Sequence, residues 1–264
     1  MRFLRYPGGK KKLLEFIAQY LPNDISGNYV DPFVGGGALF WYLKPQKSLL
    51  SDLNQDLIDL YKGIRHYPHK VWEIFKSFSE GKEAYYKIRE EDINDKRIWY
   101  RAARILYLNR TCFKGMWRHN ANGKFNVGYG GEARRWVITY QNIIKLSNIL
   151  KSTTILRSDF SITLDQVVNG DFIFLDPPYR PGEKEMLHAH YINGKFTYHE
   201  QLRLAEKIID LSNKNDIKWM MTNSDHPEIL QLYKSFNIIK IPKGTSSTVG
   251  VLTSISKEVL ITNY

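Results

Sequence analysis

The segment Asp171-Phe-Ile-Phe-Leu-Asp-Pro-Pro-Tyr179 decides how the rest of the chain is interpreted. Residues 171–175 form an apolar, aromatic and β-branched run, which predicts a buried strand. Two prolines end this strand, because proline cannot donate to the hydrogen-bond ladder of a central strand, and the first one favours an extended backbone at Asp176. Ligands of open α/β sheets bind at the carboxyl ends of the strands, so the Asp176 carboxylate is a candidate functional group.

The tetrapeptide Asp-Pro-Pro-Tyr suits chemistry on an exocyclic amine of a flat ring. The Asp176 carboxylate and the Pro177 carbonyl can each accept one N–H, which returns electron density to the amine nitrogen. Tyr179 can stack on the ring, as aromatic side chains do with unstacked bases. The alternative interpretation is a strand that ends in a proline turn with a solvated Asp176.

Length and composition exclude several classes of protein. The 264 residues suffice for one large domain or for a domain with an insert. No run approaches the roughly 18 apolar residues of a membrane helix, and the first residues lack the apolar core of a secretion signal. The single cysteine, Cys112, excludes an internal disulfide framework and a Cys-rich zinc site. We therefore expect a cytoplasmic protein.

The net charge of +11 is concentrated in one window of the chain. Residues 96–135 contain ten lysines and arginines against the single acid Glu132, so this window carries most of the excess. Such localisation favours a footprint for a polyanion over a generally solvated surface. Within a predicted helix at 97–108, Arg97, Arg101 and Arg104 share one face, as phosphate contacts would require.

Two glycine-rich turns precede that window. Arg5-Tyr-Pro-Gly-Gly-Lys10 leads into a predicted helix at 11–21, and its glycines would let the backbone approach a ligand, although it is equally consistent with a plain loop. Asp31-Pro-Phe-Val-Gly-Gly-Gly37 lies between a short predicted strand and a helix through Tyr42. Its spacing is neither the dinucleotide fingerprint nor a phosphate loop, so it suits a nucleoside without phosphates.

Acidic residues end two further predicted strands. Ser48-Leu-Leu-Ser-Asp52 ends in a carboxylate that can accept hydrogen bonds from ribose hydroxyls. The alternative role of Asp52 is the N-cap of a helix from Asn54, and one side chain can serve both roles. Thr153-Thr-Ile-Leu-Arg-Ser-Asp-Phe160 predicts another strand that ends in an acid.

The remaining pattern predicts an α/β fold with a mostly parallel sheet of about seven strands. Further strands are expected at 217–222, 237–241 and 258–262, and further helices at 57–64, 71–78, 84–90, 198–212 and 226–235. We expect residues 1–55 and 145–264 to form the sheet domain, and residues 56–144 a mainly helical insert. The irregular stretch that runs from Tyr179 to Thr197 contains His188 and His190, but no third ligand is spaced beside them, so we predict a lid rather than a metal site.

The segment at 109–136 predicts a loop or hairpin that probes a nucleic-acid groove. Glycine, basic and aromatic residues interleave in it without regular periodicity. In such a loop, arginine can contact guanine edges and an aromatic ring can wedge into the base stack. Trp117 and Phe113 are equally consistent with core residues that anchor the loop.

The chain resembles the Dam-type DNA adenine-N6 methyltransferases, in which cofactor motif, recognition domain and catalytic motif follow in that order. The resemblance covers nearly the full length and rests on residues 5–10, 31–37 and 176–179. Its most specific part is Leu108-Asn-Arg-Thr-Cys-Phe-Lys-Gly-Met-Trp-Arg-His-Asn, followed by Phe125-Asn-Val. It implies a Rossmann-like methyltransferase sheet with an inserted, mainly helical DNA-recognition domain.

The resemblance also implies S-adenosylmethionine as methyl donor and double-stranded DNA as partner, with no metal, no membrane and no obligate protein partner. The implied catalytic residues are Asp176, Pro177 and Tyr179. The implied cofactor-binding residues are Tyr6, Gly8, Lys10, Asp31, Phe33, Gly35, Asp52, Asp159, Phe160 and Asp176. The implied DNA-binding residues are Arg5, Arg97, Arg101, Arg110, Phe113, Lys114, Met116, Arg118, Asn120 and Asn126.

By the same resemblance, Arg118 contacts a guanine of the target, Phe113 lies where the flipped adenine left the duplex, and Arg5 lies near the outer base pair. The chain departs from the family at Lys114, Arg5 and Gly128, where Asn, Lys and Pro are frequent, so the target GATC is a hypothesis. The alternatives are methylation of adenine in RNA or of N4 of cytosine, and a catalytically dead DNA-binding relative. Asp176, rather than Ser or Asn, argues against cytosine by family resemblance.

Overall fold

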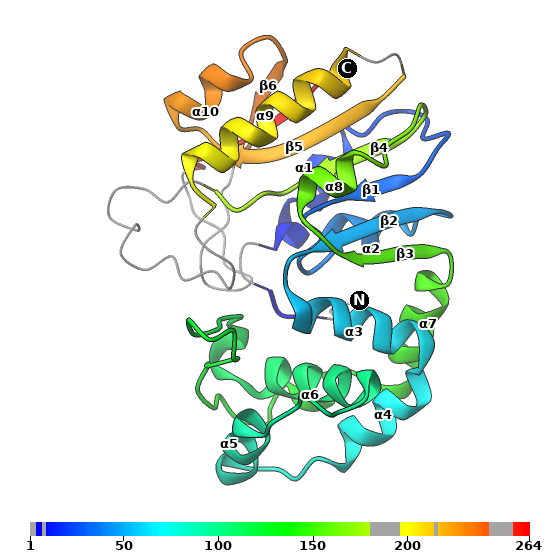
Figure 1. The fold of residues 1–264 in the computed structure, drawn as a ribbon, viewed down its shortest axis with the longest axis vertical. Helices are drawn as coiled ribbons and strands as arrows, with labels where there is room; N and C mark the ends of the chain where they lie inside the picture. The colour runs from blue at the N-terminus through cyan, green and yellow to red at the C-terminus, as the bar shows by residue number, and fades with distance from the viewer. Residues whose placement is uncertain (1–3, 7–8, 180–195, 214–215, 243–255) are drawn as a thin grey trace.

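The computed structural model describes residues 4–6, 9–179, 196–213, 216–242 and 256–264, and it contains a seven-stranded sheet (Figure 1). The strands are β1 (Tyr29–Asp31), β2 (Ser48–Asp52), β3 (Thr153–Arg157), β4 (Phe172–Leu175), β5 (Lys218–Ser224), β6 (Asn237–Lys240) and β7 (Glu258–Thr262). Their order is β3-β2-β1-β4-β5-β7-β6, and β7 runs in the direction opposite to that of the other six strands. The predicted α/β class, with a mostly parallel sheet of seven strands, is confirmed.

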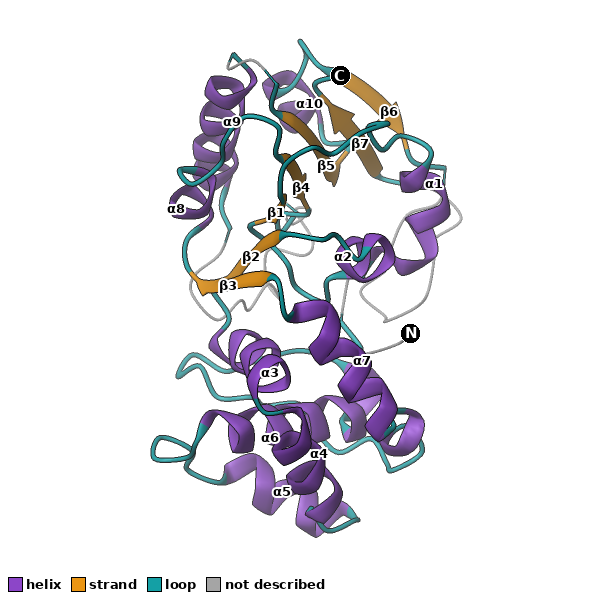
Figure 2. Ribbon diagram, turned by 90° about the vertical axis from the view of Figure 1, so that its right-hand side faces the viewer, coloured by secondary structure: helices purple, strands orange, loops and turns teal. Residues whose placement is uncertain are grey.

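Helices cover both faces of this sheet (Figure 2). On one face lie α8 (Phe160–Leu164), α9 (Tyr198–Ser212) and α10 (Pro227–Leu232); on the other lie α1 (Leu14–Ala18) and α2 (Ala38–Leu43). In β4, Phe172 and Phe174 belong to one apolar cluster, whereas Ile173 and Leu175 belong to the opposite one. This alternation explains why the strand is apolar throughout, since both of its faces are buried.

The helical portion of the molecule lies beyond β3, in the lower half of Figure 1. It consists of α3 (Gln55–His66), α4 (Pro68–Ser77), α5 (Lys82–Glu90), α6 (Ile98–Thr111) and α7 (Tyr140–Leu150). A Cβ atom on Gly63 would lie 2.4 Å from the Cβ of Ala102, so the glycine allows α3 and α6 to cross closely. One continuous apolar cluster joins these helices to the sheet, because it contains Leu50 of β2 together with Leu57 of α3.

Several element boundaries differ from the expectation. The helix predicted at 11–21 is a 3-10 turn (Lys10–Leu13) followed by the short α1, and the chain then turns before Pro22. The strand predicted to reach residue 160 ends at Arg157, because Asp159 caps α8 by accepting a hydrogen bond from the Ser161 amide. The other predicted helices are confirmed, with ends that shift by up to three residues.

Helix α7 was not predicted, although its buried Ile143, Leu146 and Leu150 have helical spacing. The helix begins at a capping box formed by Thr139 and Asn142, and it packs against α3 and α4. It therefore crosses the expected domain boundary between residues 144 and 145. Among the described residues, no helix combines the length and the apolar character that spanning a membrane requires.

Candidate active site and DNA interface

Three acidic residues meet at the carboxyl edge of the sheet. Asp52 ends β2, Asp31 ends β1 and Asp176 follows β4, and these three strands are adjacent and parallel. Asp31 is buried, and burial raises its pKa to about 8, with further contributions from the nearby carboxylates of Asp176 and Asp52. The sheet thus brings together the acids that the sequence placed at three separate strand ends.

The glycine turn after β1 is held by hydrogen bonds to these acids. Asp31 accepts from the Phe33 amide at 3.2 Å and from the Tyr29 hydroxyl at 3.0 Å, and Asp52 accepts from the Gly35 amide at 3.1 Å. Gly35 has φ +45°, in the left-handed region where a side chain would be strained. The Tyr61 hydroxyl donates to the Gly35 carbonyl at 2.8 Å. The turn is therefore a fixed platform.

Tyr6 of the opening segment packs directly on this platform. A Cβ atom on Gly36 would lie only 2.9 Å from the Cβ of Tyr6, so a residue larger than glycine could not lie beneath the tyrosine.

The N-cap alternative for Asp52 is wrong, because Asn54 is the N-cap of α3 and its side chain accepts a hydrogen bond from the Leu57 amide. Asp52 accepts instead from the Asn54 amide, at 2.9 Å.

Asp159 and Phe160 lie beside an aromatic cluster at the end of β3. Arg203 of α9 donates to both carboxylate oxygens of Asp159 at 2.8 Å, and these bonds lower the pKa of Asp159 to about 2. The Phe160 ring lies 5.4 Å from Phe33 and 5.9 Å from Phe196, measured between ring centroids. The Arg203 guanidinium lies 4.1 Å from the Phe160 ring centre.

Neighbouring side chains hold the Asp176 carboxylate through one of its two oxygens. Its Oδ1 accepts from the Lys10 ammonium at 2.9 Å and from the Thr222 hydroxyl at 2.6 Å. Within the part of the chain that the structure describes, no hydrogen bond is made to Oδ2, and the side chain is 25% exposed. The solvated-turn alternative is therefore wrong, because Asp176 is an oriented carboxylate with an acceptor atom left over.

Lys10 forms the centre of a buried polar cluster. Its ammonium lies 3.7 Å from Glu258 of β7 and 4.7 Å from the centre of the Tyr179 ring, whose hydroxyl donates to Glu258 at 3.0 Å. Burial alone would lower the pKa of Lys10, but Asp176, Tyr179 and Glu258 outweigh it and raise that pKa. Burial raises the pKa of Tyr179, so its hydroxyl stays protonated. Lys10 was expected to hold the donor, and in the structure its contacts are with Asp176, Tyr179 and Glu258.

The two proline carbonyls have different partners. Gln201 of α9 donates to the Pro178 carbonyl at 3.0 Å and is itself bound by Asn223 of β5 at 3.1 Å. The Pro177 carbonyl accepts no hydrogen bond from the described residues. After Asp176, the Pro178 carbonyl is therefore held by a hydrogen bond, whereas the Pro177 carbonyl has none from the described residues.

The predicted hairpin at 109–136 is held by two antiparallel bridges, Cys112 with Tyr129 and His119 with Phe125. Arg118 is exposed and donates to the Asn126 side-chain oxygen at 2.9 Å, which orients its guanidinium. The Asn120 side chain accepts from two backbone amides of the tip. Figure 1 shows the hairpin, in green, on the side of the molecule where the parallel strands end.

The opening segment and the hairpin hold each other in place. The Arg5 amide donates to Asn109 at 3.0 Å, and the Asn109 amide group donates back to the Arg5 carbonyl at 2.7 Å. A Cβ atom on Gly115 would collide with the Arg5 side chain, so the two are in close contact. This contact lies in a 3-10 turn (Phe113–Gly115), which leaves Phe113 49% exposed and gives Lys114 a φ of +50°.

The predicted basic face of helix α6 is wrong. Arg104 is buried and donates to the carbonyls of Ile88 and Arg89, and Arg110 is buried and donates to the Arg134 carbonyl. Arg101 pairs with Asp59 at 2.7 Å. These guanidinium groups hold the helices together because α6 lies at the centre of the helical portion, so we do not propose Arg101 or Arg110 as phosphate contacts.

The exposed basic residues of this window lie mainly on the hairpin: Lys114, Arg118, Lys124 and Arg134. Arg97 is also exposed, but it is the N-cap residue of α6, at the end of that helix away from the hairpin. Met116 is half-buried, and its carbonyl accepts from the Cys112 thiol. Trp117 is half-buried against Tyr6 and Phe125, so the structure favours the anchoring role for this ring.

Sequence reasoning missed three residues of other elements that contact the motif: Gln201 of α9, Thr222 of β5 and Glu258 of β7. It also missed Arg203 of α9, which binds Asp159. No spacing in the sequence relates these residues to Asp176 or Asp159, and only the fold brings them close. Gly8 and residues 180–195 of the predicted lid, which include His188 and His190, lie outside the described residues. Among those that are described, no three His, Cys, Asp or Glu side chains gather as a metal site.

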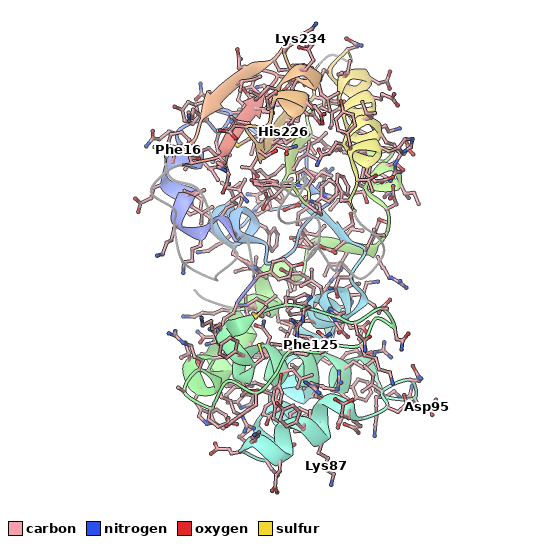
Figure 3. All side chains as sticks on the ribbon, turned by 90° about the vertical axis from the view of Figure 1, so that its left-hand side faces the viewer. Phe16, Lys87, Asp95, Phe125, His226 and Lys234 are labelled. Atoms are coloured by element: carbon pink, nitrogen blue, oxygen red, sulfur yellow. The ribbon has the colours of Figure 1, made fainter. Side chains whose placement is uncertain are left out.

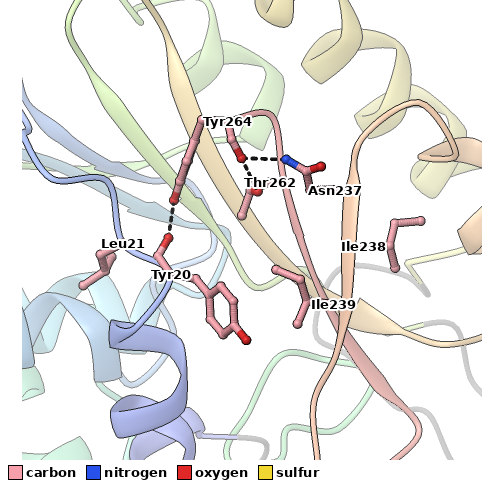
Figure 4. A pocket seen from close by; sticks show the side chains of 7 residues that line it. All are labelled: Tyr20, Leu21, Asn237, Ile238, Ile239, Thr262 and Tyr264. Carbon is pink, nitrogen blue, oxygen red and sulfur yellow. Dashed lines mark hydrogen bonds between the residues drawn. The ribbon is translucent and has the colours of Figure 1, made fainter.

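A separate hollow lies at the far end of the sheet (Figure 4). It is lined by Tyr20, Leu21, Asn237, Ile238, Ile239, Thr262 and Tyr264. Thr262 pairs with Met220 near the start of β5, whereas Glu258 pairs with Ser224 at its end. The hollow therefore opens at the edge opposite to Asp176 and is not part of the site.

Comparison with known proteins agrees with this geometry. The family of D12 class N6 adenine-specific DNA methyltransferases matches residues 6–246. The chain is 34% identical over 276 residues to a Type II methyltransferase of Lactococcus lactis subsp. cremoris, covering 99% of the chain and 95% of that protein. It is 34% identical over 290 residues to a Type II methyltransferase of Methanocaldococcus jannaschii (99% and 98% covered). It is also 27% identical over 261 residues to the DNA adenine methylase of Escherichia coli strain K12 (97% and 92% covered).

Proposed function

Because the chain belongs to the D12 class N6 adenine-specific DNA methyltransferases, we propose that it transfers a methyl group from S-adenosylmethionine to N6 of an adenine rotated out of duplex DNA, in the sequence GATC. One observation carries this proposal. Two adjacent acceptors, Asp176 Oδ2 and the Pro177 carbonyl, receive no hydrogen bond from the described residues, while their neighbouring acceptors are occupied. An exocyclic amine with two N–H groups fits this pair.

The neighbouring contacts suit the orientation of such an amine. Lys10 and Thr222 bind Oδ1, so the Asp176 carboxylate cannot rotate away from its incoming partner. Gln201 binds the Pro178 carbonyl and fixes the backbone after the motif. Two accepted N–H bonds would direct the nitrogen lone pair out of conjugation with the ring, and this positioning supplies part of the rate.

Tyr179 supplies a surface for the base. Lys10 lies over one face of its ring, so an extruded adenine would stack on the other face. Base–aromatic stacking contributes about 1–3 kcal/mol, which is comparable with the few kcal/mol that removal of a base from the stack costs. The tyrosine hydroxyl remains bound to Glu258, so the ring keeps its orientation.

The donor site suits a nucleoside without phosphates. Tyr6 and the turn through Gly35 provide a close-packed platform, and Asp52, beside them, is a carboxylate for ribose hydroxyls. The rings of Phe33 and Phe160, with Asp159 at their edge, would receive the adenine ring of the donor. When bound, the donor supplies a methyl group already activated by its positive sulfur.

Duplex DNA would be bound by the exposed charges of the hairpin and by Arg97 at the start of α6. Arg97 would contact phosphates, and Arg118, oriented by Asn126, would contact a guanine edge. The exposed Phe113 would fill the space that the adenine leaves, with Arg5 beside it. With DNA as substrate, we expect a cytoplasmic, nucleoid-associated protein.

Methyl transfer from tritiated S-adenosylmethionine tests the reaction. The protein is incubated with duplex DNA or with RNA, and the labelled nucleoside is identified after digestion. We expect N6-methyladenine from duplex DNA. Label in N4-methylcytosine, or in RNA alone, would reject the proposed substrate. The absence of methyl transfer to any duplex would indicate a catalytically inactive DNA-binding protein.

Digestion of treated plasmid with methylation-sensitive endonucleases then tests the sequence. We expect GATC sites to become protected against cleavage. Protection of a different set of sites would overturn GATC while leaving adenine methylation in place.

A further inference from the structure

The DNA-reading hairpin contacts the donor side of the molecule at two points. Trp117 packs against Tyr6, with 5.5 Å between the ring centroids, and Tyr6 rests on the glycine turn. His119 Nε2 lies 2.8 Å from Asp56 Oδ2, which places a hydrogen bond between the hairpin and the first turn of α3. Figure 3 labels Phe125, the bridge partner of His119, between the helices and the sheet above them.

His119 is the more specific of these contacts. Its side chain is 1% exposed and is enclosed by the rings of Trp117 and Phe125, at 6.1 and 5.6 Å. Its Nδ1 is buried and has no hydrogen-bond partner among the described residues. The bond to Asp56 is therefore the polar contact that fixes the orientation of this imidazole.

Asp56 belongs to the same turn as the expected ribose carboxylate. Asp52 accepts hydrogen bonds from the Gly35 amide and from the Asn54 amide, and Asn54 caps the helix that contains Asp56. A carboxylate has acceptor sites for further hydrogen bonds, so a donor hydroxyl could bind Asp52 beside these amides. This additional bond would hold the turn at residues 52–56, and with it Asp56, in one position.

The neighbours of His119 in the hairpin are the residues that face DNA. His119 points inward at its bridge with Phe125, whereas Arg118 and Asn120 on either side are exposed. Successive side chains of an extended strand point to opposite faces. The backbone that directs the His119 imidazole inward therefore directs Arg118 outward, where Asn126 orients its guanidinium.

The tip of the hairpin is otherwise separated from the turn. A hollow between them is lined by Leu53, Asn54, Gln55, Asp56, His119, Ala121, Asn122, Gly123 and Arg157. Asp56 and His119 both line this hollow, so their hydrogen bond spans the gap between the hairpin and the turn.

We propose that His119 is a positioning residue whose bond to Asp56 makes the placement of the DNA-reading hairpin depend on the donor site. This inference rests on the proposed function, because duplex DNA is the ligand that the hairpin reads. Its consequence is reciprocal coupling: occupation of the donor site tightens duplex binding, and duplex binding tightens donor binding by the same factor.

The test measures the dissociation constant of a fluorescent GATC duplex with and without saturating S-adenosylhomocysteine. For the wild-type protein we expect the compound to tighten duplex binding by at least about fivefold, the lower end of common coupling factors. His119→Leu keeps the volume but removes the donor atom, and should bring this factor close to one. His119→Gln, whose amide can still reach Asp56, should retain part of the coupling.

Two further variants distinguish loss of the His119–Asp56 hydrogen bond from general destabilisation of the protein. Asp56→Ala removes the acceptor of the same hydrogen bond, at a more exposed position, and should abolish the coupling as His119→Leu does. It therefore tests the inference even if the His119→Leu protein does not fold. His69→Leu removes an exposed histidine that is bonded to Tyr140, and should leave the coupling unchanged. Binding of S-adenosylhomocysteine alone establishes that each variant is folded.

The inference fails if the wild-type factor is one, or if His119→Leu or Asp56→Ala keeps the wild-type factor. These measurements require binding but no methyl transfer. Failure of the proposed function would appear instead as absence of N6-methyladenine with the wild-type protein, so the two failures are distinguishable.

Discussion

The Lys10 ammonium lies 2.9 Å from Asp176 Oδ1, although one residue belongs to the opening segment and the other follows β4. Both are largely withdrawn from solvent, and Glu258 lies 3.7 Å from the same ammonium. Lys10 therefore compensates two carboxylates that would otherwise repel each other in the interior. The opening segment, residues 5–10, is therefore held against the motif at residues 176–179 by charge as well as by packing.

We expect Lys10→Met to destabilise the protein by about 3–5 kcal/mol, because it leaves Asp176 and Glu258 without their cation. Urea denaturation would measure the free energy of unfolding. Lys12→Met, in the same segment but exposed, should change it by no more than about 0.5 kcal/mol. Glu258→Gln should restore part of the loss in the Lys10→Met background. Equal losses in the two lysine variants would contradict this account.

Asp176→Asn should lower kcat by at least about 100-fold, a usual loss when a positioned proton-accepting group is removed. The amide cannot accept from the adenine amine and from Lys10 as the carboxylate does. Duplex binding should be nearly unchanged, because the contacts with DNA that we propose lie on the hairpin. Single-turnover methylation and fluorescence anisotropy measure the two quantities. Asp165→Asn, an exposed acid bonded to Lys207, serves as control, and near wild-type turnover of Asp176→Asn would refute the assignment.

The fold was largely predictable because its signals are local. Each buried strand is a short apolar run, and β4 ends at Leu175, two residues before Pro177, because proline cannot continue the hydrogen-bond ladder. Parallel strands share an edge, so Asp31, Asp52 and Asp176 could be expected at one place. The glycine turn was recognisable from its own residues.

The partners of the motif were not predictable, because they come from sequence-distant elements. Nothing near Thr222 or Glu258 indicates a contact with Asp176 or Lys10, and only the strand order creates it. The arginines of α6 were misassigned for a related reason. Helical spacing told which of them share a face, but not that Arg104 and Arg110 would be enclosed by neighbouring helices.

Arg118→Ala should relax specificity for one base pair of the target. A bidentate arginine–guanine contact contributes about 1–3 kcal/mol of discrimination, so the preference for the cognate duplex should fall roughly 5- to 150-fold. Competition between cognate and singly substituted duplexes measures this preference. Arg97→Ala, at an exposed position, should instead weaken binding to all duplexes alike. It should also reduce the slope of the logarithm of the binding constant against the logarithm of the salt concentration by about one. A uniform loss with Arg118→Ala would remove its proposed role in base recognition.

Asp31→Asn should change how stability depends on pH. Burial raises the Asp31 pKa from its ordinary value of 3.8 to about 8, so the folded protein holds this proton more tightly than the unfolded chain does. Its contribution to stability is complete below the unfolded pKa and is lost as pH rises through the folded one.

The wild-type protein should therefore lose on the order of 2 kcal/mol of unfolding free energy between about pH 6 and pH 8 through this group. The amide introduced by Asp31→Asn cannot ionise, so this variant should lack that part of the loss. Urea denaturation of both proteins at the two pH values measures the difference. Asp24→Asn, an exposed acid of the loop before β1, should keep the wild-type dependence. If Asp31→Asn follows the wild-type protein across this range, the Asp31 carboxyl is ionised in the folded state, and the Tyr29 and Phe33 hydrogen bonds outweigh its burial.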